Sequence, residues 1–158
     1  MFDAEWYADA ARAALAPQLT DPAALAAPGW PTLSPLRAFA LRATFPAMRP
    51  WAVAWAIDGA DLVVARWPRI GRVPAGNDRH PCYWVYRVAL GDAVKFAVYS
   101  GPLYLAARVR HPGGTTKMCC VLEQAPALVA LLGAARGRAR ITAVPRGGSD
   151  GGQGDGSG

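Results

Sequence analysis

Few side chains in this chain are of the kind that performs catalysis or binds metals. Two histidines and three cysteines are present: His80, Cys82, His111, Cys119 and Cys120. Thiolate and imidazole groups hold zinc when they converge, typically from Cys-x-x-Cys pairs, and the chain has no such pair. Neighbouring residues of a strand point to opposite faces, so Cys119 and Cys120 cannot easily share an ion. We therefore expect no metal and no cofactor.

A cysteine beside a histidine could act as a thiol nucleophile with the imidazole as its base. Sequence spacing alone does not bring either histidine to a cysteine, so a thiol-dependent enzyme stays an alternative. Buried, unreactive cysteines are the simpler interpretation, because free Cys behaves as a small hydrophobic residue. The enzyme hypothesis is accordingly not favoured, and no catalytic residue is assigned.

Two further patterns suggest chemistry but fit turns better. The segment 111–117, His-Pro-Gly-Gly-Thr-Thr-Lys, is glycine-rich like a phosphate loop. A phosphate loop leads into a helix, whereas Lys117 leads into a strand-like apolar run, so a hairpin turn is expected. Asp58 and Asp61 flank Gly59-Ala60 and are expected as turn residues rather than as an acid–base pair.

Basic residues are unevenly distributed along the chain. Residues 62–146 contain eleven Arg and two Lys against three acids, a net charge of +10. Residues 1–61 and 147–158 each carry a net −2, which gives the chain its total of +6. Such an excess predicts a negatively charged partner for the second half of the chain.

Two arginine clusters and one aromatic group are the candidate partner-binding residues. If residues 136–140 are extended, their arginines form a ladder on one side, able to contact phosphates or an acidic protein. The alternative is a solvated, charged edge strand. The candidate residues of the two clusters are Arg66, Arg69, Arg72, Arg79, Arg136, Arg138 and Arg140.

The aromatic group depends on a predicted hairpin around Gly91-Asp92. A two-residue loop there puts Val88 and four candidate binding residues on one face: Trp84, Tyr86, Lys95 and Tyr99. Aromatic rings beside a lysine suit base stacking next to a phosphate contact. The alternative is aromatic pairing of Trp84 with Tyr99 across a half-buried sheet. A loop one residue longer or shorter would reverse the faces.

Arginine outnumbers lysine fifteen to two, and alanine, glycine and proline are abundant. These residue types have GC-rich codons, which indicates a GC-rich genome of a bacterium, a phage or a large DNA virus. Codon bias accounts for the type of basic residue. It does not account for the position of the basic residues in one half of the chain.

The elements that must position these residues follow from periodicity and turn signals. Apolar stripes and proline starts predict helices over residues 2–15, 22–27, 36–43 and 126–135. Alternation between glycine, proline and aspartate turns predicts strands over residues 51–57, 62–67, 82–90, 93–100, 103–110, 117–122 and 140–144. Residues 68–81 are expected to form a long loop. Trp30, Trp51, Trp55 and Trp67 are expected at the rim of the core.

This order predicts an α+β class: an antiparallel meander of five to seven strands, with N-terminal helices and one late helix packed on one face. We expect one domain over residues 1–146, helical over 1–46 and mainly β over 51–146. A chain of 158 residues is long enough to bury a core without metal or disulfides. The glycine-rich segment 147–158 is expected to be a flexible tail.

Location and function follow from these features as hypotheses. No apolar run reaches the roughly 20 residues of a membrane span, and the acidic N-terminus differs from a signal peptide. Three cysteines without framework spacing favour a reducing, cytoplasmic compartment, or a virion if the protein is viral. The leading hypothesis is a non-enzymatic binding or assembly subunit, structural or accessory, that engages an acidic protein in a homo- or hetero-oligomer. The alternative is a nucleic-acid-binding module.

Overall fold

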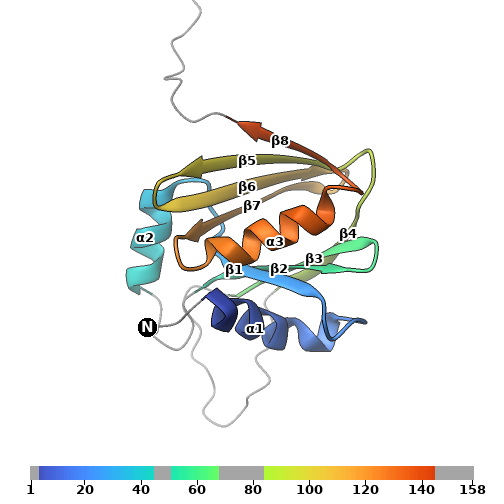
Figure 1. The fold of residues 1–158 in the computed structure, drawn as a ribbon, viewed down its shortest axis with the longest axis horizontal. Coiled ribbons are helices and arrows are strands. Elements are labelled where there is room, and N and C mark those ends of the chain that lie inside the picture. The colour runs from blue at the N-terminus through green and yellow to red at the C-terminus, as the bar shows by residue number, and fades with distance from the viewer. Residues whose placement is uncertain (1–3, 45–50, 68–83, 145–158) are drawn as a thin grey trace, which may run out of the picture.

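The structure, a computed structural model, describes residues 4–44, 51–67 and 84–144. Within these ranges the chain forms three α-helices and eight strands in an α+β fold, and the predicted class is confirmed. The strands lie in two four-stranded sheets rather than in one meander. Sheet A has the order β1-β2-β3-β4 and sheet B the order β7-β6-β5-β8 (Figure 1).

The N-terminal segment differs from prediction in one element. Helix α1, Ala4–Leu15, forms as predicted and buries one apolar stripe, and a 3-10 turn, Ala16–Gln18, follows it. The predicted helix over residues 22–27 is wrong, because strand β1, Leu25–Gly29, lies there and pairs antiparallel with β2. Ala26 faces α1 and Ala27 faces the opposite core, so both faces of the strand are covered. A strand buried on both faces shows no polar alternation to distinguish it from a helix.

The end of β1 joins the two sheets. Trp30 and Cys119 exchange backbone hydrogen bonds at N···O distances of 2.9 and 2.8 Å. The approach depends on Gly29, where a Cβ would lie 2.7 Å from the Met118 Cγ and 2.8 Å from the Cys119 carbonyl oxygen. Any larger residue would push β1 and β7 apart. One hydrogen-bonded ribbon therefore runs through both sheets.

Strands β2, Val53–Asp58, and β3, Asp61–Arg66, form the predicted hairpin, with Asp58 opposite Asp61. Gly59 occupies its turn with a φ of +63°, a conformation that favours glycine. The tryptophans predicted at the core rim, Trp30, Trp51, Trp55 and Trp67, are all buried. The predicted loop over residues 68–81 lies outside the described residues, as does the predicted tail.

The predicted hairpin around Gly91-Asp92 is wrong. Its strands exist as β4, Trp84–Ala89, and β5, Lys95–Gly101, but they belong to different sheets. Strand β4 pairs with β3, whereas β5 pairs with β6 and β8. The turn itself forms, since the Val94 N–H donates to the Gly91 carbonyl at 3.0 Å. It carries the chain from sheet A to sheet B instead of reversing it.

The remaining elements largely follow the prediction. Strands β6, Tyr104–His111, and β7, Gly114–Val121, form a hairpin, and helix α3, Ala125–Ala135, follows. Strand β8, Arg140–Val144, pairs parallel with β5. The predicted arginine ladder is wrong, because residues 136–138 form a turn after α3 and only Arg140 is in a strand.

The layers explain which surfaces stay open. Helix α1 covers one face of sheet A, and the main core lies between the sheets, where α3 packs against both (Figure 1). Helix α2, Pro35–Thr44, covers one end of the outer face of sheet B, where Ala38 joins Trp30, Tyr104, Ala106 and Cys119. The other half of that outer face has no covering element among the described residues.

Candidate functional site

The open half of sheet B is a surface of aligned cations. Residues directly opposite one another on neighbouring strands point to the same face. Lys95 of β5 lies opposite Arg110 of β6 and Arg140 of β8, which forms a first row. Arg108 lies opposite Lys117 of β7 two residues further along, which forms a second row. We call these five residues the basic face: Lys95, Arg108, Arg110, Lys117 and Arg140.

The basic face points to solvent. The alternate residues of the same strands, among them Phe96, Val109 and Met118, are buried in the main core. Four of the five cations are exposed, and Arg108 is half-buried with its guanidinium carbon 6.0 Å from the Tyr99 ring centroid. Strands β5 to β8 contain no Asp or Glu. Within residues 4–44, 51–67 and 84–144, none of the five has an ion-pair partner.

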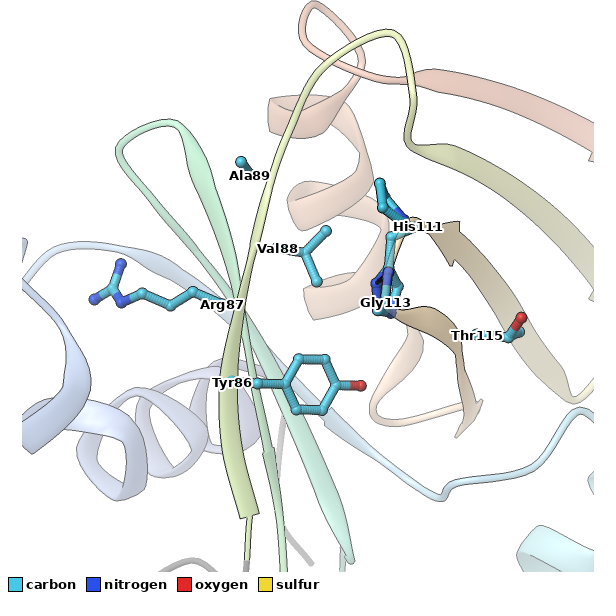
Figure 2. Close-up of a pocket in the computed structure, with 8 residues that line it drawn as sticks. Tyr86, Arg87, Val88, Ala89, His111, Gly113 and Thr115 are labelled. Carbon is cyan, nitrogen blue, oxygen red and sulfur yellow. Dashed lines mark hydrogen bonds between the residues drawn. The ribbon is translucent and has the colours of Figure 1, made fainter.

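A cleft lies beside this face, between β4 and the β6–β7 turn. Its volume is about 570 Å³, and its walls include Tyr86, Val88, His111 and Pro112 (Figure 2). Tyr86 is hydrogen-bonded through its hydroxyl to Thr116, and its ring centroid lies 5.9 Å from that of His111. The Gly113 N–H donates to the His111 Nδ1 at 3.2 Å. The His111 Nε2 lies 3.4 Å from the Thr116 hydroxyl oxygen. The cleft is thus largely preformed by hydrogen-bonded aromatic side chains.

A third cluster, around Asp58, is structural. The buried carboxylate accepts hydrogen bonds from the Thr20 N–H at 3.0 Å and the Thr20 hydroxyl at 2.9 Å, and from the Asp21 N–H at 3.0 Å. It also pairs with the Arg87 guanidinium at 2.7 Å. The hydrogen bond from the Thr20 N–H has the largest effect on the pKa of Asp58 and the bond from Arg87 the next largest. Together they hold this pKa well below its ordinary value. The predicted turn residue therefore also fixes the segment before β1 to the β2–β3 hairpin.

The predicted site residues do not form one surface. Lys95 and Arg140 belong to the basic face, and Tyr99 lies on the same side of sheet B, half-buried beside Arg108. The single aromatic face is wrong, because Trp84 and Tyr86 are in β4 of sheet A. Three others are exposed away from the rows: Arg66 at the end of β3, and Arg136 and Arg138 after α3. Arg69, Arg72 and Arg79 lie outside the described residues.

Sequence reasoning missed three members of the basic face. Arg108 and Arg110 are two residues apart in one strand, which places both on the same side. Lys117 joins them because the β6–β7 hairpin pairs it with Arg108. The alternation Arg-Val-Arg was a usable signal. It is weaker in the sequence than the clusters at 66–79 and 136–140, which contain more arginines.

The cysteines offer little support for thiol chemistry. Cys119 and Cys120 are buried, and the Cys120 thiol donates to the Pro28 carbonyl oxygen at 3.1 Å. Burial raises the pKa of Cys120 well above its ordinary value, with the Cys119 thiol as a second cause. His111 bonds to Gly113 and Thr116 instead of a thiol. Cys82 and His80 lie outside the described residues. Among the described residues, no three His, Cys, Asp or Glu side chains gather in a cluster that could hold a metal ion.

We therefore expect the thiols of Cys119 and Cys120 to be unreactive in the folded protein. In a Cys82→Ser variant at neutral pH, Ellman's reagent should label neither thiol within minutes, because both thiols are buried and the Cys120 thiolate is disfavoured. Both should react at once in guanidinium chloride. Rapid labelling of the folded variant would contradict this burial and reopen the thiol-enzyme hypothesis.

Compared with known proteins, the chain matches no family model, no curated protein and no solved structure. In the described part of the chain, no helix is long and apolar enough to cross a membrane. The basic face and the adjacent cleft are the candidate functional surfaces of the described residues.

Proposed function

We propose that the protein is a non-enzymatic binding subunit that engages an acidic protein surface through the basic face of sheet B. The observation that carries this proposal is the alignment of five cations in two rows on strands without a single carboxylate. Like charges held this close repel one another in the free protein. A partner with complementary carboxylates relieves that repulsion and gains orientation from the fixed rows.

The chemistry of the face favours a protein partner over a nucleic acid. Base recognition on a sheet needs exposed aromatic rings on which bases stack. Tyr99 is the aromatic residue on this side of sheet B beside the cations, and it is half-buried with Arg108 at its ring. Carboxylates on a flat protein surface need no stacking ring, because arginine and lysine bind them through charge and hydrogen bonds. Nucleic-acid binding remains the second candidate, because the same rows could hold a phosphate backbone.

A role in a larger complex is part of the same proposal. A face of exposed, unpaired cations is typical of a surface that meets a partner, and a structural or accessory subunit of a bacterial, phage or viral assembly would use it in this way. We also propose a reducing, cytoplasmic location. In the part of the chain that the structure describes, Cys119 and Cys120 form no disulfide, which supports this location.

Direct binding to two polyanions tests the proposal. Fluorescence anisotropy with labelled poly-glutamate and with a labelled single-stranded oligonucleotide, each over a salt series, should show tighter binding of poly-glutamate at equal charge. Binding of either probe should weaken with salt, because the contacts are ionic. Absence of poly-glutamate binding at low salt would refute the proposal. Preferential binding of the oligonucleotide with a steep log-linear salt dependence would replace it by the second candidate.

A further inference from the structure

Strand β4 has an unpaired edge among the described residues. The Leu90 N–H donates to the Ala60 carbonyl at 2.9 Å, which makes these two a hydrogen-bonded pair of the β3–β4 ladder. Such pairs alternate along an antiparallel ladder, so Val88 and Tyr86 also bond to β3. The backbone N–H and C=O groups of the intervening residues point away from β3. These residues are Val85, Arg87 and Ala89.

The cleft runs along this edge. Four consecutive residues of β4, from Tyr86 to Ala89, line one wall, and the β6–β7 turn lines the other. Figure 2 shows Tyr86 and Val88 pointing from β4 toward that turn, whereas Arg87 points away. Arg87 is held on the far side by Asp58, so its contribution to the cleft is backbone. An extended peptide here would find main-chain partners on one side and apolar or aromatic side chains beneath it.

The side chains of the cleft are already in place. The hydroxyl bond of Tyr86 to Thr116 and the ring packing of Tyr86 on His111 fix the floor before any ligand arrives. Val88 and Pro112 add apolar surface beside these rings. A volume of about 570 Å³ accommodates one or two apolar side chains of a peptide. Preformed sites lose little conformational entropy on binding.

The cleft and the basic face meet at Thr115, on the β7 edge of sheet B. Thr115 lines the cleft and lies opposite Arg110, the β6 member of the first row. From Thr115 the row continues through Arg110 and Lys95 to Arg140. Neighbouring strands are about 4.8 Å apart, so the row is about 14 Å long and matches four or five extended residues. A bound peptide that leaves the cleft past Thr115 and turns over the β7 edge therefore meets a cation on each of β6, β5 and β8.

We propose that the partner docks as an extended peptide that adds a strand to β4 in this cleft and then crosses the basic face with acidic residues. This inference rests on the proposed function and names the form of the acidic partner: an apolar segment with alternating side chains, followed by carboxylates. The apolar side chains enter between Tyr86 and Pro112. The carboxylates meet Arg110, Lys95 and Arg140.

The test uses a fluorescein-labelled peptide with a valine- and threonine-rich half followed by a glutamate-rich half. Ala89→Pro removes an outward N–H and leaves the bonds to β3 intact, because proline is tolerated on the open side of an edge strand. We expect binding to weaken about tenfold, the equivalent of one or two main-chain hydrogen bonds and a blocked edge. Ala89→Ser keeps the N–H and should bind as the wild type does.

A modified ligand provides the same test without altering the protein. N-methylation at alternate residues of the apolar half removes strand hydrogen bonding and keeps the charge, and it should also weaken binding about tenfold. This measurement decides the matter if Ala89→Pro does not fold. Peptide binding that is unchanged by both modifications would overturn strand addition. Binding of poly-glutamate would still test the proposed function, because it depends on the basic face alone. Concentration-dependent dimerisation abolished by Ala89→Pro would overturn the peptide as occupant in favour of a second copy of the chain.

Discussion

Replacing Asp58 by Asn should lower the free energy of unfolding by about 2–4 kcal/mol, the largest effect on stability expected of any single polar substitution described above. The carboxylate is buried, with hydrogen bonds from Thr20 and Asp21 and an ion pair with Arg87. The amide keeps the size of the side chain but loses the charge. Its NH2 group also faces the groups of Thr20, Asp21 and Arg87 that donate to the carboxylate. Guanidinium denaturation followed by circular dichroism measures the loss. Asp61→Asn, in the same turn but half-exposed, is the matched control and should cost less.

The same substitution should remove part of the acid sensitivity of the fold. Because the pKa of Asp58 is lower in the folded state than its ordinary value of 3.8, its stabilisation is fully present above about pH 5. It is lost progressively as the pH falls below 4 toward the folded pKa. The stability difference between wild type and Asp58→Asn should therefore be constant from pH 5 to 7 and shrink toward pH 2. A difference that does not change with pH would contradict the assigned charge interactions.

Reversing two charges of the basic face should have the largest effect on binding. In Lys95→Glu/Arg110→Glu, two neighbouring cations of the first row become anions, since the two residues are directly opposite each other. Binding of poly-glutamate should weaken about 30-fold at low salt, because each reversal replaces an attraction by a repulsion and changes the binding free energy by about 1 kcal/mol. The effect should diminish at high salt as the charges are screened.

A matched control separates local charge from net charge. Arg37→Glu/Arg136→Glu changes the total charge by the same amount at exposed residues outside the rows. It should reduce binding only slightly. Equal losses in both double variants would mean that poly-glutamate responds to the overall charge of the protein and that the basic face is not a site.

The sequence predicted most elements because their signals are local. The apolar stripe of α1 and the turn at Gly59 are read within a few residues. The error at β1 arose where local signals conflict with tertiary structure. Asp21-Pro22 resembles a helix start, but the Asp21 N–H is bonded to Asp58, 37 residues away in sequence. Pairing with β2 then extends Leu25–Gly29 as a strand.

The candidate site was less predictable for a related reason. A turn signal such as Gly91-Asp92 predicts that the chain turns. It does not predict which strands pair afterwards. Strand β5 instead takes β8 as a neighbour, so Lys95 and Arg140, which are distant in sequence, become adjacent. The cleft is also formed by segments distant in sequence, with Tyr86 from one sheet and His111 from the other. The periodicity and composition of a sequence do not reveal which distant segments pair in this way.

The bridge between Trp30 and Cys119 has a consequence for self-association. Because it joins β1 to β7, the described strands form one ribbon with two outer edges, β4 and β8. Exposed edges are templates on which copies of a protein can stack into fibrils. Here β8 begins with the charged Arg140, which repels the same charge of an incoming copy, and β4 forms one wall of the cleft whose other wall is the β6–β7 turn. The fold can thus admit a slender peptide while its architecture discourages growth of the sheet from molecule to molecule.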